Sequence, residues 1–285
     1  MTEPDTPPIR YERRGHVALL TLDRPATRNA LDGEAMYAAF EGLFARMNDD
    51  AEVRAAVLTG AGSAFCSGGD VAAMRDRTGM FAGSPDEIAR RYREGIQRIP
   101  RAFETLEVPI VAAVNGPAIG AGNDLACLCD IRIAADTARF AESFVKVGIV
   151  PGDGGAWLLP RTVGASKAAE MALTGDAIDA DEALACGLVS RVVPAAGLLD
   201  AAMALAGRIA ANPPKAVRWT KSLLRQARTG TLEEALVAAA RVQGHAHQTE
   251  EHAEAVASFF EALERRRAAK GGQDGRGGEG GKSGG

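Results

Sequence analysis

The fold is decided by the stretch Val114-Asn115-Gly116-Pro117-Ala118-Ile119-Gly120-Ala121-Gly122-Asn123-Asp124-Leu125-Ala126-Cys127. The run before it, Val108–Val114, is short, apolar and rich in β-branched residues, which predicts a buried strand. The run after it, Asp124–Ile133, is mostly apolar and predicts a buried helix or strand. The three glycines between them predict a tight turn whose free N–H groups point at one spot, which suits a developing negative charge. A well-packed turn without a ligand is the alternative at this point.

A second stretch has the same design. Ala56-Val57-Leu58-Thr59-Gly60-Ala61-Gly62-Ser63-Ala64-Phe65-Cys66-Ser67-Gly68-Gly69-Asp70 is an apolar strand that enters a glycine-rich turn. Together, Phe65–Asp70 and Val114–Gly122 resemble two signatures of the crotonase superfamily, the enoyl-CoA hydratases and isomerases. A third signature of that family resembles Phe140 followed by Gly148–Gly155 and then Leu159-Pro160-Arg161. The resemblance runs from about Val17 to about Arg267.

The resemblance implies an α/β fold with a crotonase-like ββα spiral core and a C-terminal helical region that packs subunits into a homotrimer or a dimer of trimers. The residue pattern itself predicts strand 16–22, helix 34–48 and strand 54–59. This β-α-β start equally allows a doubly wound sheet. We expect a flexible N-terminus at 1–14, a spiral core at 15–197, a helical region at 198–270 and a disordered Gly-rich tail at 271–285.

One long helix is predicted at 86–103, between the two glycine turns. Its outer face is rich in arginine, which is typical of a solvated face; contacts to the phosphates of coenzyme A are the alternative. The arginines are Arg90, Arg91, Arg93, Arg98 and Arg101. The resemblance implies that this region shapes the acyl pocket.

Composition excludes several classes of protein. The 285 residues are 46% apolar and 25% charged with a net charge of −4, which gives no electrostatic reason to bind nucleic acid or an anionic membrane. No apolar run is long enough to span a bilayer. The N-terminus lacks the apolar core of a signal peptide, so we expect a cytoplasmic protein. Without a CxxC pair, the four cysteines predict buried thiols rather than a metal site or disulfides: Cys66, Cys127, Cys129 and Cys186.

The resemblance implies chemistry on a coenzyme A thioester, whose oxygen becomes negative in an enolate. The matching oxyanion donors are the backbone N–H groups of Ser67 and Ala121, each worth about 3–4 kcal/mol by analogy with other oxyanion holes. No separate cofactor and no metal are implied, because coenzyme A enters as part of the substrate. The residues that match the coenzyme A and substrate contacts are Arg28, Ser67, Gly68, Gly69, Asp70, Gly120 and Phe144.

A hydratase needs two acid–base groups, and the family's hydratases carry a glutamate at each of two places. The first place is Asp124 here, and the second is Phe144, which cannot transfer a proton. Glu142 and Asp153 are the candidates for the missing acid, and Asp153 has a turn-forming role as its alternative. We treat Asp124 as the principal catalytic residue, with Asp153 preferred to Glu142.

Because Phe144 replaces the second glutamate, the sequence favours double-bond isomerisation of an acyl-CoA over hydration of a 2-enoyl-CoA. Two alternatives from other classes stay open. One is a non-catalytic acyl-CoA-binding protein, and the other is a thioester hydrolase or dehalogenase with an aspartate nucleophile. The sequence does not identify the acyl chain.

Overall fold

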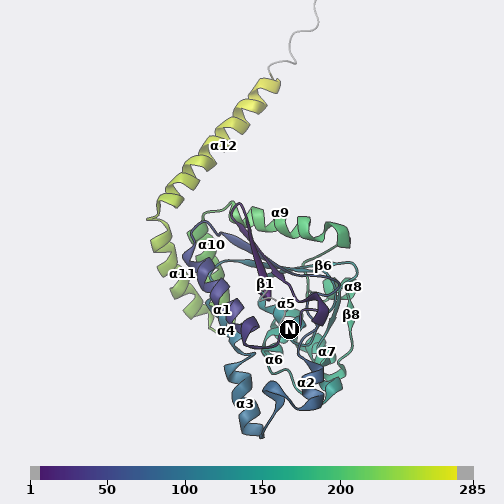
Figure 1. Cartoon of the computed structure of the whole chain (residues 1–285). Helices are drawn as coiled ribbons and strands as arrows, with labels where there is room; N and C mark the ends of the chain where they lie inside the picture. Colours follow the sequence, from purple (N-terminus) through teal and green to yellow (C-terminus); the bar gives the residue numbers. More distant parts are fainter. Residues whose placement is uncertain (1–6, 275–285) are drawn as a thin grey trace, which may run out of the picture. The chain divides into compact units, whose positions relative to one another are not determined.

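The computed structural model describes residues 7–274, with side chains described as far as Arg266. Its described residues divide into two compact units, 7–212 and 213–274. The boundary follows Asn212 rather than residue 197, because helix α9 (Leu198–Ala210) packs on the sheet of the first unit. Figure 1 shows the chain coloured along its length.

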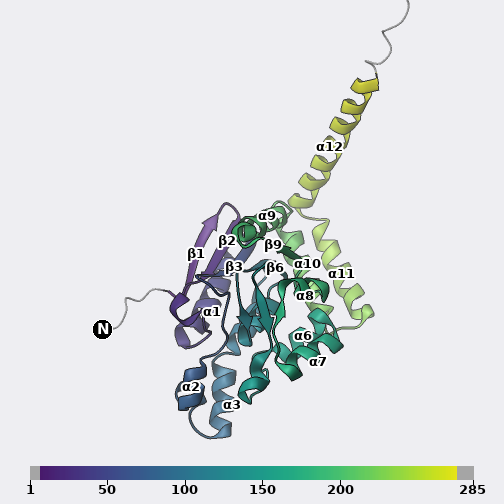
Figure 2. The same ribbon diagram turned by 90° about the vertical axis from the view of Figure 1, so that its right-hand side faces the viewer.

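The first unit contains two sheets. The larger has the spatial order β1 (Ile9–Arg14), β2 (Val17–Leu22), β3 (Ala55–Gly60), β4 (Ile110–Val114), β6 (Ile131–Ala135) and β9 (Arg191–Val193). The smaller has the order β5 (Ala118–Ile119), β7 (Arg139–Ala141) and β8 (Ile178–Asp179). Only β1 of the larger sheet is antiparallel to its neighbour; β2 to β9 are parallel. Figure 2 shows several of these strands side by side.

The strand order identifies a spiral. From β2 to β9 each new strand of the larger sheet is added on the same side, whereas a doubly wound sheet reverses direction partway. After β4 and again after β6 the chain makes one short strand in the smaller sheet, β5 and β7, before the next α-helix. The predicted ββα spiral is therefore confirmed, and the doubly wound alternative is excluded.

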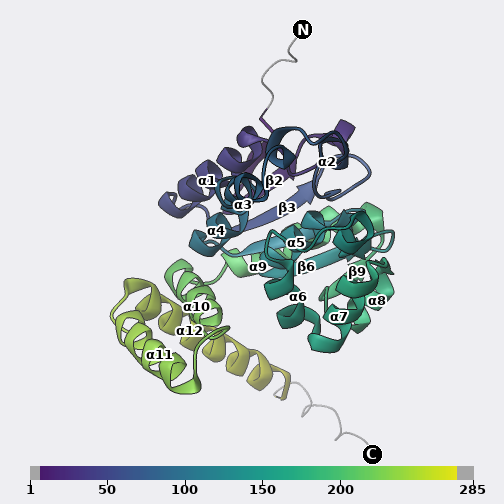
Figure 3. The same cartoon turned by 90° about the horizontal axis from the view of Figure 1, so that it is seen from below.

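Around these two sheets the first unit forms a series of helices. They are α1 (Glu34–Asp49), α2 (Val71–Asp76), α3 (Pro85–Glu94), α4 (Arg98–Thr105), α5 (Ala121–Leu128), α6 (Gly155–Val163), α7 (Ala165–Thr174), α8 (Ala180–Ala185) and α9. Short 3-10 turns occur at 25–27, 79–81, 143–147 and 195–197. Figure 3 shows α1, α3 and α4 grouped together and α6, α7 and α8 grouped together.

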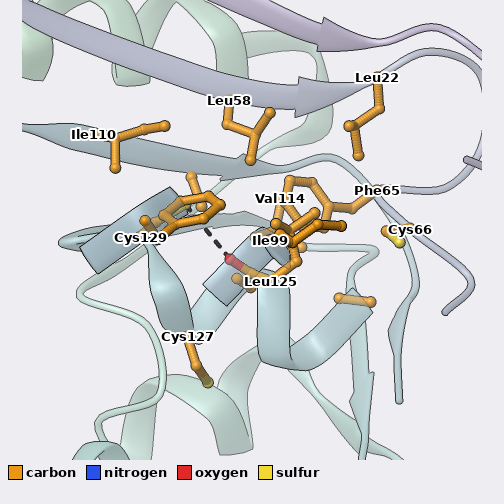
Figure 4. Packing of buried hydrophobic residues seen from close by; sticks show 14 of the residues in the cluster. Leu22, Leu58, Phe65, Cys66, Ile99, Ile110, Val114, Leu125, Cys127 and Cys129 are labelled. Atoms are coloured by element: carbon orange, nitrogen blue, oxygen red, sulfur yellow. Dashed lines mark hydrogen bonds between the residues drawn. The ribbon is translucent and has the colours of Figure 1, made fainter. Parts of the chain in front are cut away.

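Successive side chains along a strand point to opposite faces of the larger sheet, so a hydrophobic core forms on each face. Val57 and Val111 pack against α9, whereas their neighbours Leu58 and Ala112 pack on the opposite side. That second side is the main core, closed by α1, α4 and α5, and Figure 4 shows Leu58 there, with Leu125 of α5 also labelled. Both faces of β4 are thus buried, which explains why Val108–Val114 reads as a continuous apolar run.

Three of the four cysteines lie in this main core. Cys66, Cys127 and Cys129 are buried free thiols, and Cys186 is partly buried. Burial raises the pKa of the Cys66 and Cys127 thiols to about 12, so both are neutral at physiological pH.

Two sequence predictions need correction. Ile9–Arg14, placed in a flexible terminus, pairs along its whole length with β2 as an antiparallel edge strand, with Ile9 in the core. The long helix predicted at 86–103 is two helices, because Gly95 between α3 and α4 has φ −112° and ψ −109°. A side chain at Gly95 would lie 2.7 Å from the Arg91 carbonyl oxygen and 3.3 Å from the Tyr37 ring, so glycine permits this break.

The second unit consists of α10 (Pro214–Gln226), α11 (Leu232–Ala246) and α12 (Glu250–Asp274). Helix α12 continues four residues into the segment predicted as a Gly-rich tail, and the rest of that tail lies outside the described residues. Residues 1–6 of the predicted flexible N-terminus also lie outside them. Across 7–274, no helix is both long enough and apolar enough to cross a membrane. The trimer stays a prediction.

Candidate active site

The two glycine turns of the sequence lie against each other. Ile119 N–H donates to the Cys66 carbonyl (3.0 Å), and both Phe65 N–H and Cys66 N–H donate to the Pro117 carbonyl (3.1 Å). The fit is close enough to require glycine, because a side chain at Gly122 would lie 2.1 Å from the Cys66 carbonyl oxygen. Strands β3 and β4 therefore deliver both turns to one edge of the sheet, as the two motifs predict.

The two predicted oxyanion donors lie on these turns, but they differ in their present partners. Ala121 is the first residue of helix α5, and its N–H group donates to no backbone carbonyl of the described residues. No described side chain caps the N-terminus of that helix. Ser67 N–H instead donates to the Arg28 carbonyl (3.0 Å), and the Ser67 hydroxyl donates to the Thr27 carbonyl (3.1 Å). One N–H group is thus available here, and the second is engaged by the loop that precedes α1.

Asn29 fixes that loop. Its side chain is fully buried, donates to the carbonyls of Ala64 (3.0 Å) and Phe65 (3.2 Å), and accepts from Arg24 N–H (3.0 Å). Arg28 and Asn29 both have left-handed backbones, with φ of 53° and 60°. These contacts hold an uncommon conformation in place and present the Arg28 carbonyl to Ser67.

Three buried carboxyl groups converge beside the Ala121 turn. Asp124 lies in the first turn of α5, Glu142 follows β7 and Asp153 precedes α6; they are 1%, 1% and 7% exposed. Asn123 Nδ2 donates to Glu142 Oε1 (2.7 Å). Both oxygens of Asp124 lack a hydrogen-bond partner within the described part of the chain. The structure therefore brings together all three acids that the sequence singles out.

Burial and mutual repulsion hold protons on this cluster. Burial raises the pKa of Asp124 well above its usual range, and the charges of Glu142 and Asp153 raise it further. Burial, followed by the Glu142 charge, raises the pKa of Asp153 to about 7. Burial also raises the pKa of Glu142. Near neutral pH the cluster can therefore both accept and supply a proton, as an acid–base site requires.

A small cavity joins two of these acids. Its volume is about 10 Å³, and Asp124, Asp153 and Ala121 line it with apolar residues around them. That volume is close to the roughly 10–15 Å³ that one water molecule needs, and two carboxyl groups can supply its hydrogen bonds. The cavity can hold a single water beside Asp124 and Asp153.

Two larger cavities meet at Ala121. One, of about 490 Å³, has Asp153, Tyr37, Tyr92 and Phe144 in its wall. The other, of about 100 Å³, lies along Ser67, Gly68 and Gly120. Ala121 and Phe144 line both, so a ligand whose carbonyl meets the Ala121 N–H could extend in two directions.

The remaining predicted binding residues have these positions. Asp70 caps α2 by accepting from Ala73 N–H (3.0 Å), while Gly69 and Asp70 also line the larger cavity. Arg28 is exposed on the surface loop. Gly120 has φ 54°, and a side chain there would lie 3.5 Å from the Phe144 ring, so the buried ring packs over the turn instead of presenting an acid.

Three residues that hold this site were not predicted. Asn123 binds Glu142, Asn29 holds the Arg28 loop, and Gln97 Nε2 donates to the Gly152 carbonyl (2.8 Å) beside Asp153. Asn123 falls inside a recognised motif, whereas Asn29 precedes the predicted helix 34–48 and belongs to none of the quoted motifs; the burial of both was the missing information. Nothing in the sequence links Gln97 to a turn 55 residues away.

Comparison with known proteins gives one consistent result. The profile of the family described as "Enoyl-CoA hydratase/isomerase" matches residues 12–268. The "Probable enoyl-CoA hydratase echA8" of Mycobacterium bovis is 37% identical over 89% of this chain and 95% of its own length. The "Short-chain-enoyl-CoA hydratase" of Clostridium acetobutylicum is 35% identical over 88% and 93%. The crystal structure of an enoyl-CoA hydratase from Bacillus anthracis superposes with a TM-score of 0.83 at 31% identity, covering 90% of this chain and 96% of that one.

Proposed function

The chain belongs to the enoyl-CoA hydratase/isomerase family, and we propose that it adds water to the double bond of a 2-enoyl-CoA thioester. The observation that carries this proposal is the cluster of Asp124, Glu142 and Asp153, with a water-sized cavity between Asp124 and Asp153. The names of the similar curated proteins support hydration rather than isomerisation. We therefore prefer hydration, which the sequence analysis kept as its alternative.

The carboxyl cluster can supply the second acid–base group that Phe144 lacks. Hydration needs one group to activate water and another to protonate carbon. A phenyl ring does neither, but Asp153 and Asp124 reach the same small cavity from two different elements. Burial and the neighbouring charges raise the pKa of both aspartates, so one can hold a proton while the other is ionised.

In the proposed reaction, the Asp153 carboxylate takes a proton from water as the water oxygen bonds to the β-carbon of the enoyl group. The π electrons move onto the thioester oxygen, and the resulting enolate lies at the Ala121 N–H group. Protonated Asp124 then delivers its proton to the α-carbon, which gives the 3-hydroxyacyl thioester. Proton return from Asp153 to Asp124 through the small cavity restores the starting state.

A second oxyanion donor would strengthen this step. Ser67 N–H supplies it if the substrate oxygen displaces, or shares the N–H with, the Arg28 carbonyl. Each such donor is worth about 3–4 kcal/mol in comparable sites. We assign the coenzyme A arm to the side of Ser67 and Gly68, along the smaller cavity, with Arg28 near its nucleotide end. No cofactor besides the substrate's own coenzyme A enters the proposal.

Isomerisation is the second candidate, and the observation that favours it is Phe144, an apolar ring packed on Gly120 where a hydratase would carry its second glutamate. The same acids could move a proton from one carbon to another without adding water. A thioester hydrolase or a non-catalytic binder would need neither proton transfer between carbons nor the addition of water to the double bond.

Product analysis in deuterated water separates these activities. The protein is incubated with matched 2-enoyl-CoA and 3-enoyl-CoA thioesters, and products are identified by mass spectrometry. We expect a 3-hydroxyacyl-CoA with deuterium at the α-carbon from the 2-enoyl substrate. Deuterium uptake with a shifted double bond and no hydroxyl would establish isomerisation instead. Release of free coenzyme A would indicate hydrolysis, and binding without any conversion would contradict an enzymatic role.

A further inference from the structure

The position of the acids identifies which cavity receives the acyl group. The α- and β-carbons lie on the acyl side of the thioester carbonyl, so the groups that act on them must lie there too. Asp153 lines the cavity of about 490 Å³, whereas the cavity of about 100 Å³ contains none of the three acids. With the carbonyl at Ala121, the acyl group enters the larger cavity. This step rests on the proposed function.

The walls of that cavity are aromatic and held in place. The Tyr92 ring lies against Gly152, where a side chain would approach within 2.8 Å, and the Tyr37 ring lies against Gly95, where one would approach within 3.3 Å. Phe81 packs edge-on against Tyr92 with ring centroids 6.4 Å apart. Glycine thus allows both tyrosine rings to lie close to the backbone.

Part of the remaining lining is apolar and adaptable in shape. It includes Met74, Met80, Ile96 and Ile149. Met80 accepts a weak hydrogen bond from the Tyr37 hydroxyl (3.9 Å to sulfur). Thioethers adjust their shape and pack favourably at ring edges. A volume near 490 Å³ is within the roughly 300–1,000 Å³ of pockets that bury drug-sized ligands, so a four-carbon acyl group would leave most of it to water.

Among the described residues, the lining offers no free cation to a second carboxylate on the substrate. Apart from Asp153, its acidic residues are Asp32, Glu34, Asp70 and Glu94, and three of them are ion-paired: Asp32 with Arg24, Glu34 with Arg98 and Glu94 with Arg90. Arg91 is the basic residue of this lining, and it already donates to the carbonyls of Gly79 and Ala82. A distal carboxylate would lose its hydration near these acids without gaining a free cation.

We infer that the acyl group is large, uncharged and ring-bearing: an aryl-substituted acyl chain that stacks between Tyr37, Tyr92 and Phe81. Aromatic pairs add to simple apolar burial in such a site. Neither a short straight chain nor a chain that ends in a carboxylate uses this lining.

Binding of saturated thioesters tests the inference apart from the reaction, because they cannot be hydrated. Calorimetry with the full chain compares 3-phenylpropionyl-CoA, butyryl-CoA, heptanoyl-CoA, adipoyl-CoA and free coenzyme A. We expect the phenylpropionyl thioester to bind at least about 10-fold more tightly than the butyryl thioester. It should also bind more tightly than the heptanoyl thioester, and the adipoyl thioester should bind at least about 10-fold more weakly than the heptanoyl one.

Two phenylalanine variants on α2 assign the effect to this cavity. Ala73 lines it and its neighbour Ala72 is exposed and does not. Ala73→Phe should weaken phenylpropionyl-CoA binding about 10-fold and leave free coenzyme A unchanged, whereas Ala72→Phe should change neither.

Equal or tighter binding of butyryl-CoA or heptanoyl-CoA would overturn the aryl assignment, and tightest binding of adipoyl-CoA would overturn the charge argument. An equal effect of Ala72→Phe would remove the assignment to the cavity. If no thioester binds more tightly than free coenzyme A, the inference fails. The reaction with 2-enoyl-CoA then tells whether the proposed function fails with it.

Discussion

Gly155 lies directly against the Asp124 carboxyl group: a methyl group at its α-carbon would be 2.3 Å from Asp124 Oδ1. Gly155 is the first residue of α6, and Asp124 belongs to α5, so the contact fixes the acid by packing two helices. The absence of a side chain at position 155 is what leaves room for the carboxyl group.

Gly155→Ala should therefore displace the Asp124 carboxyl and reduce kcat by about 10-fold or more, because misplacing a reacting group by about 1 Å can cost about 100-fold. Steady-state kinetics with a 2-enoyl-CoA would measure it. Gly42→Ala in helix α1 is the matched control, since nothing lies within 4 Å of its added methyl group. That control should keep full activity and gain about 0.5–1 kcal/mol of stability. Full activity in Gly155→Ala would contradict the proposed position of Asp124.

Ala121→Pro tests the oxyanion donor. Proline removes the N–H group yet is tolerated at the first position of a helix, which Ala121 occupies. We expect kcat to fall by about 100- to 1,000-fold. Ala121→Gly keeps the N–H group and should retain activity within a few-fold. Circular dichroism must show that both variants fold alike; comparable activity in the two would show that this N–H group does not bind the oxyanion.

Glu142→Gln tests the charge that holds protons on the cluster. The Glu142 charge raises the pKa of Asp153 and of Asp124, so its removal should lower both. The profile of kcat/KM against pH should shift to lower pH on both limbs, with its maximum kept within a few-fold. A maximum lowered about 100-fold or more at every pH would instead make Glu142 itself the second catalytic acid.

Asp153→Asn should stabilise the fold while it removes activity. The pKa of Asp153 is about 7 in the folded protein and near 3.8 when unfolded, so the folded state binds more protons between these values. This group's contribution to stability is therefore present at pH 4 and is lost as pH rises to about 7. Asparagine does not titrate and has no such loss. The free energy of unfolding of the variant should therefore exceed that of the wild type at pH 8 by up to about 4 kcal/mol.

Thermal or urea unfolding at pH 5 and pH 8 measures this difference. The difference in the free energy of unfolding between the variant and the wild type should increase with pH. A difference that stays constant from pH 5 to pH 8 would mean that Asp153 titrates in its ordinary range.

Much of this site could be predicted from sequence because its parts are local. Strand-then-glycine runs around Gly68 and Gly120 identified both turns, and motif position identified Asp124 and Asp153. The rest depends on distant contacts. The hydrogen bond from Ser67 N–H to the Arg28 carbonyl depends on two consecutive residues with left-handed backbones, Arg28 and Asn29. No sequence pattern predicts that conformation. The tyrosine walls exist because Gly95 and Gly152 approach them from other elements.

In the proposed reaction, Asp124 supplies a proton to a bound enoyl thioester. The most direct test compares the wild type with Asp124→Asn, using hydration of a 2-enoyl-CoA for the rate and calorimetry with its saturated analogue for affinity. We expect kcat to fall by about 100-fold or more while the dissociation constant changes by no more than a few-fold. An Asp124→Asn variant that hydrates the substrate at the wild-type rate would contradict this role of Asp124.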